Sequence, residues 1–341
     1  MKLESENILI EKAVACLIGG LVGDAMGTPT EGMDLASIRE RFGWVDTFEG
    51  DGTDDTVMRD LLIEALVNTA GDATLDDWAA AWLGNWDAIF GVKQAKFFIS
   101  VLHTAQKLRR HAVPRLAALG NMPSSSSAMC ISPVGIVNAC QPKRAASQAY
   151  NLGSLIHVHD VGFCQDGAAA IATAVAAAFV PDTDIDAVIA AAIEAIIPNS
   201  GAEMRSRIAR VLDLADEAGT FEAFCTALYA RGDEMFCRII CDSRETIPLT
   251  LAVLKLAEGE VAQAVTFAAN LGRDADTIGA MAGAVSGALR GVEGIPAVWL
   301  EQLGPAVVSR QVSLARQLAA VACKKREADL AALALLGTIT Q

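Results

Sequence analysis

The chain has 341 residues, 52% of them hydrophobic, and a formal net charge of −14 with a pI near 4.7. Nonspecific binders of nucleic acid or of anionic membranes normally carry a basic face, so the acidic balance argues against both kinds of partner. The length suffices for a sizeable buried core. The apolar residues are mostly Ala, Leu, Val and Ile, with 2 Tyr and 5 Trp, which favours a packed helical body over a β-sandwich.

Hydrophobic periodicity of the helical kind recurs along nearly the whole chain, and no stretch shows a convincing run of alternating strands. The predicted fold class is therefore all-α, a compact bundle of many helices. Turn-forming residues separate the helices without a long linker, so residues 1–341 are expected to form a single domain. The expected helices span about residues 8–25, 55–69, 75–89, 93–110, 144–158, 165–180, 184–197, 203–217, 220–230, 246–257, 260–271, 276–290 and 310–335.

The first motif in chain order is GGLVGDAMGTPTE, residues 19–31. It looks like a glycine-rich nucleotide loop, but it lacks the Lys-Ser/Thr pair of a P-loop and follows a helical rather than a strand pattern. We therefore reject the nucleotide-loop interpretation. The glycines are expected to end the first helix and to leave Glu31 on a constrained turn.

Two acidic segments, DGTDDT at residues 51–56 and DADT at residues 274–277, are the most informative feature of the chain. Each places carboxylates beside a hydroxyl, and the two together would make an all-oxygen cage for hard divalent cations. Surface turns and helix N-caps use the same residue types, so the first segment alone fits that alternative equally well. Together the segments favour a metal-dependent enzyme.

The segment NMPSSSSAMCISPVG, residues 121–135, is the strongest candidate for ligand contact. Its hydroxyls and accessible backbone N–H groups suit phosphate or ribose oxygens, although a solvated serine-rich loop is the alternative. His157 and His159, two residues apart on an expected helix, do not face the same way, so a metal-binding pair is rejected. His157 is instead expected to be a hydrogen-bonding substrate contact. The predicted substrate contacts are Ser124, Ser125, Ser126, Ser127, Met129, Gly135 and His157.

Glycine recurs every four residues just after the second acidic segment, at positions 279, 283, 287 and 291. This spacing puts all four on one stripe of a helix, at a cost of roughly 1 kcal/mol each relative to Ala. Close backbone contact with a neighbouring helix is the expected reason. Such contact would fix the second acidic segment against the core.

The eight cysteines include no C-x-x-C pair, and the N-terminal segment lacks the apolar centre of a signal peptide. We interpret them as reduced thiols and expect a cytoplasmic protein. The longest apolar run, from Gly167 to Val180, has 14 residues. A bilayer span needs roughly 18 to 20. This run is therefore expected to be a buried core helix, without a membrane partner.

The order of the motifs is similar to that of the ADP-ribosylglycohydrolase family, whose founding members remove ADP-ribose from proteins. The resemblance runs from about residue 12 to 300 and rests on GDAMGTPTE, DGTDDT, SAMCISPVG, LIHVHD, ETIPLTLAVLKLAEG and NLGRDADTIGAMAGAVSGALRG. It implies an all-α fold with a dinuclear Mg²⁺ or Mn²⁺ centre at the bottom of a cleft.

Site residues follow from the same resemblance. Glu31 matches the acidic residue that approaches the metals, and Asp24 matches a residue with a supporting hydrogen-bond role. Glu31 or a metal-bridging aspartate, Asp55 or Asp276, would act as general base. The residues that match the two metal-binding motifs are Thr53, Asp54, Asp55, Asp274, Asp276 and Thr277.

The resemblance implies hydrolysis of an N- or O-glycosidic bond at ribose C1″ of an ADP-ribosylated protein or a small ADP-ribose derivative. Such a reaction needs an activated water and protonation of the leaving group. The pocket departs from the family pattern in three places: the serines at 124–127 replace a glycine-rich stretch, Cys130 stands where Arg is frequent, and Arg273 stands where a small or acidic residue is common. The alternatives are a hydrolase of a smaller ribosyl compound or nucleoside, or a non-catalytic ADP-ribose-binding protein.

Overall fold

The computed structural model describes residues 7–340, and within that range the chain forms helices joined by turns and loops, with no strand. The prediction of an all-α fold is confirmed. The α-helices are α1 (Ile8–Gly27), α2 (Leu35–Phe42), α3 (Asp54–Asn68), α4 (Leu75–Gly84), α5 (Trp86–Phe90), α6 (Ile99–Arg109), α7 (Pro114–Ala117), α8 (Ser132–Val137), α9 (Pro142–Gly153), α10 (Phe163–Ala178), α11 (Ile185–Ala195), α12 (Ala202–Ala218), α13 (Phe221–Ala230), α14 (Gly232–Met235), α15 (Ser243–Leu256), α16 (Val261–Leu271), α17 (Ala275–Arg290) and α18 (Ala297–Ile339). Short 3₁₀ turns are η1 (Thr28–Thr30), η2 (Gln94–Lys96), η3 (His159–Val161) and η4 (Val292–Gly294).

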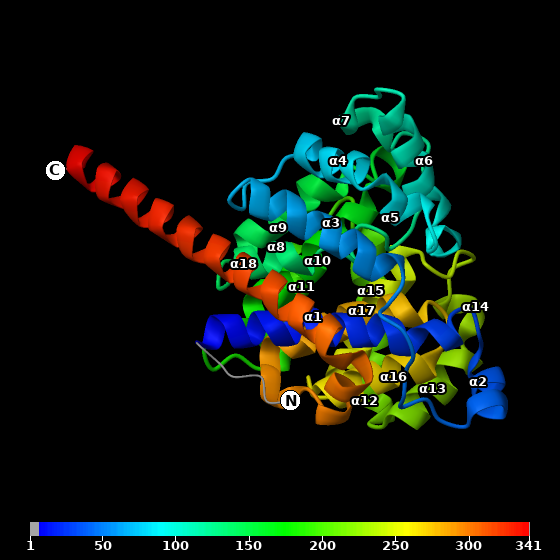
Figure 1. The fold of residues 1–341 in the computed structure, drawn as a ribbon. Coiled ribbons are helices and arrows are strands. Elements are labelled where there is room, and N and C mark those ends of the chain that lie inside the picture. The colour runs from blue at the N-terminus through cyan, green and yellow to red at the C-terminus, as the bar shows by residue number, and fades with distance from the viewer. Residues whose placement is uncertain (1–6, 341) are drawn as a thin grey trace.

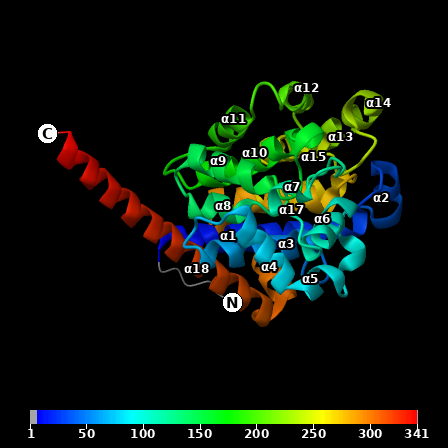
Figure 2. The same cartoon turned by 90° about the horizontal axis from the view of Figure 1, so that it is seen from above.

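Helices α1 and α17 pack against each other along their length at the centre of the molecule (Figures 1 and 2). Their backbones touch, because a Cβ added to Gly23 would overlap the carbonyl oxygen of Gly279, and one added to Gly19 would overlap that of Gly283. Gly287 meets the backbone of Ala15 in the same way. The predicted glycine contact is thus confirmed for three of its four positions.

Two expectations about glycine were wrong. Gly291 is not part of the stripe: it ends α17 with a φ of 71°, a left-handed conformation that glycine adopts without strain. Of the glycines in residues 19–31, Gly27 ends the first helix as expected, but Gly19, Gly20 and Gly23 lie inside it. A helix tolerates them here because the close approach of α17 buries the backbone that they leave uncovered.

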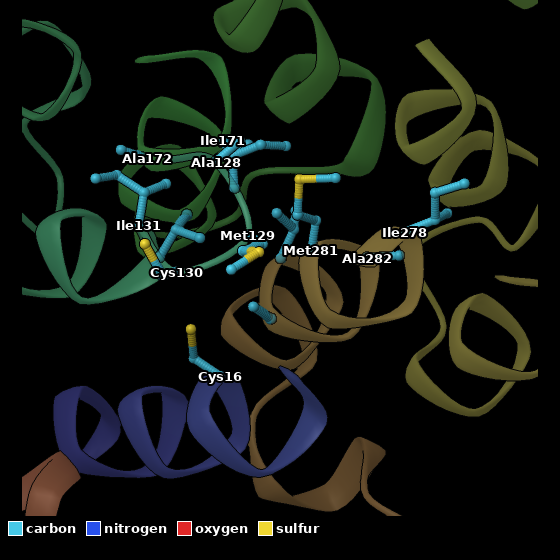
Figure 3. Packing of buried hydrophobic residues seen from close by; sticks show 14 of the residues in the cluster. Cys16, Ala128, Met129, Cys130, Ile131, Ile171, Ala172, Ile278, Met281 and Ala282 are labelled. Carbon is cyan, nitrogen blue, oxygen red and sulfur yellow. The ribbon is translucent and has the colours of Figure 1, made fainter. Parts of the chain in front are cut away.

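The core is one continuous apolar cluster that contains residues from Ala13 to Val321. In Figure 3, Cys16 of α1, Ile171 of α10 and Met281 of α17 surround the segment 128–131 that precedes α8. The stretch His159–Ala178 is long and apolar enough to cross a membrane, but 89% of its 18-residue apolar window is buried inside the protein. The expected core helix in this region, α10, is therefore present.

Several predicted boundaries need correction. The predicted helix 93–110 contains the turn η2 and begins as α6 only at Ile99, and the predicted helix 144–158 ends at Gly153. His157 therefore lies in the loop after α9 rather than on a helix. Helices α2 and α8 were not predicted, because each is too short to show a clear hydrophobic period.

The last helix, α18, is broken at Gly304, where φ is 76°, and continues from Pro305. Its C-terminal part leaves the body of the molecule and projects away from it (Figures 1 and 2). Leu330, Leu333 and Leu336 are exposed on this projection.

Candidate functional site

Three helix ends bring the acidic motifs together. Asp24 lies in the last turns of α1, Asp54 is the first residue of α3, and Asp274 immediately precedes α17. A helix N-terminus carries partial positive charge, so it favours the carboxylates at the starts of α3 and α17. The close packing of α1 on α17 then fixes two of these ends relative to each other.

Asp24 holds the start of α3 in place. Its oxygens accept hydrogen bonds from the backbone N–H and the hydroxyl of Thr53, at 2.8–2.9 Å, and from those of Thr56, at 3.1 and 2.6 Å. Gly52, with a φ of 86°, passes so close to this carboxylate that a Cβ would overlap it. The supporting role expected for Asp24 agrees with these contacts.

Two sets of three carboxylates have oxygens within 4.8 Å of one another: Asp24, Asp55 and Asp276, and Glu31, Asp274 and Asp276. Because four donors already occupy the oxygens of Asp24, we assign it to support rather than ligation. Asp276 belongs to both sets, which suits a residue that bridges two cations. One oxygen of Asp55 is buried without a hydrogen-bond partner, so it has an unused lone pair for a cation.

The carboxylates repel one another. Burial, followed by the negative charges of neighbouring aspartates, raises the pKa values of Asp54, Asp55 and Asp276 well above the usual range. Burial also raises the pKa of Asp274 to about 7, although a hydrogen bond from Ser125 opposes the shift. Divalent cations would relieve this repulsion, so the donor set fits the predicted metal pair.

A cavity of about 340 Å³ opens onto the carboxylates. Glu31 lies at one side, 2.8 Å from the ammonium group of Lys96. Burial alone would lower the pKa of Lys96, but its hydrogen bond to Glu31 and the charges of Asp276 and Asp54 raise it overall. The lining consists of Glu31, Asp54, Asp55, Ala95, Lys96, Phe97, Phe98, Ile99, Ser125, Ser126, Met129, Ile239, Ile240, Cys241, Asp274, Asp276 and Thr277.

The predicted metal residues are therefore in one place. Thr277 lines the cavity, and its backbone N–H donates to Asp276 at 3.0 Å. Thr53 is set behind the cavity lining, where its hydroxyl lies 2.8 Å from Asp24 and 3.4 Å from Asp55.

The predicted substrate contacts divide into two groups. Ser125, Ser126 and Met129 line the cavity, whereas Ser124, Ser127, Gly135 and His157 do not. The residues 124–127 are all buried, so the alternative of a solvated loop is wrong. Ser125 donates from its hydroxyl to Asp274 at 3.0 Å, which ties this segment to the acidic cluster.

His157 supports the serine segment from behind. It is fully buried, and its two ring nitrogens lie 2.9 Å from the hydroxyls of Ser124 and Ser127. Burial lowers the pKa of His157 to about 3, so the imidazole is neutral at pH 7. The structure does not bring His157 to the cavity as a substrate contact. Gly135 packs against Val175 in the core instead.

Sequence reasoning missed most of the cavity lining outside the acidic and serine segments. Lys96 is the last residue of η2, Phe97 and Phe98 follow it, and Ile239 and Ile240 precede α15. Neither segment carries a spacing or a residue pattern that marks a site, and they meet only through the tertiary fold. The pairing of Lys96 with Glu31 has no local sequence signal either.

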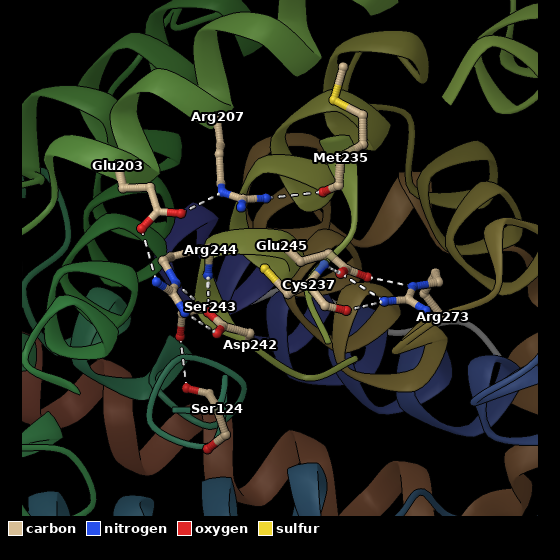
Figure 4. A network of polar contacts seen from close by, with 10 residues as sticks. All are labelled: Ser124, Glu203, Arg207, Met235, Cys237, Asp242, Ser243, Arg244, Glu245 and Arg273. Atoms are coloured by element: carbon tan, nitrogen blue, oxygen red, sulfur yellow. Dashed lines mark hydrogen bonds and ion pairs between the residues drawn. The ribbon is translucent and has the colours of Figure 1, made fainter. Parts of the chain in front are cut away.

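The segment that carries Ile239 and Ile240 is fixed by polar contacts on both sides (Figure 4). Arg273 donates to both carboxylate oxygens of Glu245, at 2.7 and 2.9 Å, and to the carbonyl of Cys237 at 2.9 Å. Arg244 is paired with Asp242 and Glu203. The side chain of Arg273 therefore links this segment of the cavity wall to α15.

Comparison with known proteins agrees with this geometry. The model of the ADP-ribosylglycohydrolase family matches residues 5–328. The chain belongs to this family. The family places it among hydrolases of glycosidic bonds, whose members typically use divalent metals.

Two curated proteins and one solved structure are similar to this chain over different lengths. The uncharacterized protein YegU of Escherichia coli is 27% identical over 316 residues, covering 84% of this chain and 89% of its own length. An uncharacterized protein of Archaeoglobus fulgidus is 37% identical over 68 residues, covering 17% and 22%. A solved structure described as an ADP-ribosylglycohydrolase-related protein complex has a TM-score of 0.68 at 18% identity, covering 92% of this chain and 99% of its own, and supports the fold.

Proposed function

We propose that this ADP-ribosylglycohydrolase-family protein hydrolyses a glycosidic bond at C1″ of a ribosyl group in a reaction that depends on two divalent cations, Mg²⁺ or Mn²⁺. The observation that carries the proposal is the meeting of five carboxylates at one cavity, with a buried and unpartnered oxygen on Asp55. The cations would be held by Asp54, Asp55, Asp274, Asp276 and the hydroxyls of Thr53 and Thr277.

The cations, when bound, supply positive charge to ribose hydroxyls and lower the pKa of a nearby water. Glu31 is the general base in this proposal. It lies beside Asp274 and Asp276, and its carboxylate is 2.8 Å from the ammonium group of Lys96. Glu31 accepts the proton of the water that attacks C1″. The bond from C1″ to the leaving group breaks, and the leaving group takes up a proton.

The eight cysteines are all free thiols, which suits a reducing compartment, and we propose the cytoplasm as the site of action.

The activity is tested by incubating the protein with Mg²⁺ or Mn²⁺ and a panel of ribosyl substrates: arginine- and serine-ADP-ribosylated proteins, and free nucleosides. We expect metal-dependent release of a ribosyl product from at least one substrate, and no release with excess chelator. Asp51→Asn is the control variant. It changes an acid of the first acidic segment whose side chain is 60% exposed and paired with Lys93, so its product release should equal that of the unchanged protein. Turnover that persists unchanged with chelator would contradict the proposal.

A further inference from the structure

The acidic cavity has little capacity for a phosphorylated ligand. Its lining has five carboxylates against one ammonium group, a net formal charge of −4. Two divalent cations would bring this charge only to zero. Lys96 is the one cationic side chain among the described residues that line the cavity, and Glu31 already pairs with it. A diphosphate entering here would meet no uncompensated positive side chain.

The neighbouring arginines cannot supply that charge without breaking their own contacts. Arg273 is occupied by Glu245, and Arg244 by Asp242 and Glu203 (Figure 4). Neither arginine lines the cavity. Glu245 is almost fully buried, so separating it from Arg273 would leave a buried charge without a partner.

Several N–H groups of the serine segment, which a phosphate site would need, already donate to acceptors within the protein. The N–H of Ser125 donates to the carbonyl of Cys241 at 2.6 Å, and that of Ser126 to the hydroxyl of Ser124 at 3.3 Å. The N–H groups of Ala128 and Met129 both donate to the carbonyl of Ser125. These N–H groups therefore do not point together toward a bound anion.

The cavity also has an apolar wall, which lies outside the acidic and serine segments of its lining. It is formed by the aromatic residues Phe97 and Phe98 from one segment and by Ile239 and Ile240 from another, with Ile99 at its exposed end. Aromatic and branched apolar side chains provide a surface for a flat, uncharged ring. The cavity volume of about 340 Å³ is at the small end of the roughly 300–1,000 Å³ typical of ligand sites.

From these observations we infer that the substrate is a ribonucleoside with an uncharged base, its ribose at the carboxylates and its base on the wall of Phe97, Phe98, Ile239 and Ile240. The inference rests on the proposed function and narrows its substrate class. The reaction consumes one water: the bond from C1′ of the nucleoside to the base nitrogen breaks, a bond from C1′ to the water oxygen forms, and a proton passes to the base. The products are free ribose and the free base.

The test uses the full chain with Mn²⁺ and measures both binding and turnover. Titration calorimetry compares the binding of adenosine, inosine, cytidine and uridine with that of ADP-ribose. Product release compares turnover of the same nucleosides with that of a protein ADP-ribosylated on arginine. We expect at least one nucleoside to be cleaved with a kcat/KM at least about tenfold above that of the ADP-ribosyl substrate. ADP-ribose should bind more weakly than that nucleoside.

Variants of the apolar wall test the place of the base. Phe98→Ala should raise the KM for the nucleoside about 5- to 100-fold, the range expected for loss of a stacking surface, with a smaller change in kcat. Ile99→Ala, at a residue that is 55% exposed, is a second variant that is expected to fold and to raise the KM in the same direction. Trp44→Ala removes a half-exposed aromatic residue outside the cavity lining and should leave the KM unchanged.

The outcomes separate the two proposals. Metal-dependent cleavage of ADP-ribosyl protein without cleavage of any nucleoside would overturn the nucleoside inference and leave the proposed function standing. Nucleoside cleavage with an unchanged KM in both wall variants would overturn the placement of the base. Absence of turnover in both substrate classes would overturn the proposed function together with the inference.

Discussion

Asp276→Ala is expected to lower the affinity for Mn²⁺ by at least about 100-fold and to abolish turnover. Asp276 belongs to both sets of converging carboxylates, so its removal takes a ligand from each candidate cation position. Loss of a residue that merely orients a ligand typically costs 10- to 100-fold in metal affinity, and loss of a shared ligand should cost more. Calorimetric titration of Mn²⁺ into both proteins measures the affinity, and product release measures turnover.

The control for this variant is Asp51→Ala, which removes the same functional group from a side chain that is 60% exposed and pairs with Lys93. It should bind Mn²⁺ as the unchanged protein does. Thermal unfolding without metal shows whether Asp276→Ala still folds, and loss of a repelling carboxylate should leave the metal-free protein at least as stable. A folded Asp276→Ala protein that keeps its Mn²⁺ affinity would contradict the dinuclear assignment.

Gly23→Ala is expected to lower the free energy of unfolding by about 1–3 kcal/mol, the usual cost of overpacking. In an open helix the same change would gain roughly 1 kcal/mol, because Ala has the higher helix propensity. Here the added Cβ would overlap the backbone of Gly279, so α1 and α17 must separate. Since both helices carry residues of the acidic cluster, Mn²⁺ affinity should fall as well.

Gly84→Ala provides the matched control. Gly84 lies at the exposed end of α4, and a Cβ there would meet nothing within 4 Å. This variant should be as stable as the unchanged protein or more stable, by about 0.4–1 kcal/mol. Urea unfolding of the three proteins measures the difference. Equal stability of Gly23→Ala and Gly84→Ala would show that the contact between α1 and α17 accommodates an added methyl group at position 23.

The features of the site that can be predicted from the sequence each lie within a single segment of the chain. Consecutive acids at the start of a helical pattern, as in Asp54 and Asp55, mark a helix N-terminus and a possible ligand set at once. The glycine spacing of α17 likewise predicts a close helix contact, because no other feature explains three glycines on one face. Both signals depend only on spacing along one helix.

The remaining part depends on contacts between distant segments. The role of His157 was misjudged because its hydrogen bonds to Ser124 and Ser127 span about thirty residues, and no periodicity shows that a loop buries it. Similarly, the N–H of Ser125 donates a hydrogen bond to the carbonyl of Cys241, which is distant in the sequence. The serine-rich segment resembles an anion site in sequence, whereas in the structure Ser125 and Ser126 line the cavity and Ser124 and Ser127 contact His157 behind it.

Anomalous X-ray diffraction from crystals of the unchanged protein grown with Mn²⁺ tests the central claim most directly. Two Mn²⁺ ions are predicted in the cavity between the starts of α3 and α17, with oxygen ligands from Asp54, Asp55, Asp274 and Asp276. Asp24 should remain hydrogen-bonded to Thr53 and Thr56. Absence of Mn²⁺ from this cavity at saturating concentration would contradict the metal centre and the function built on it.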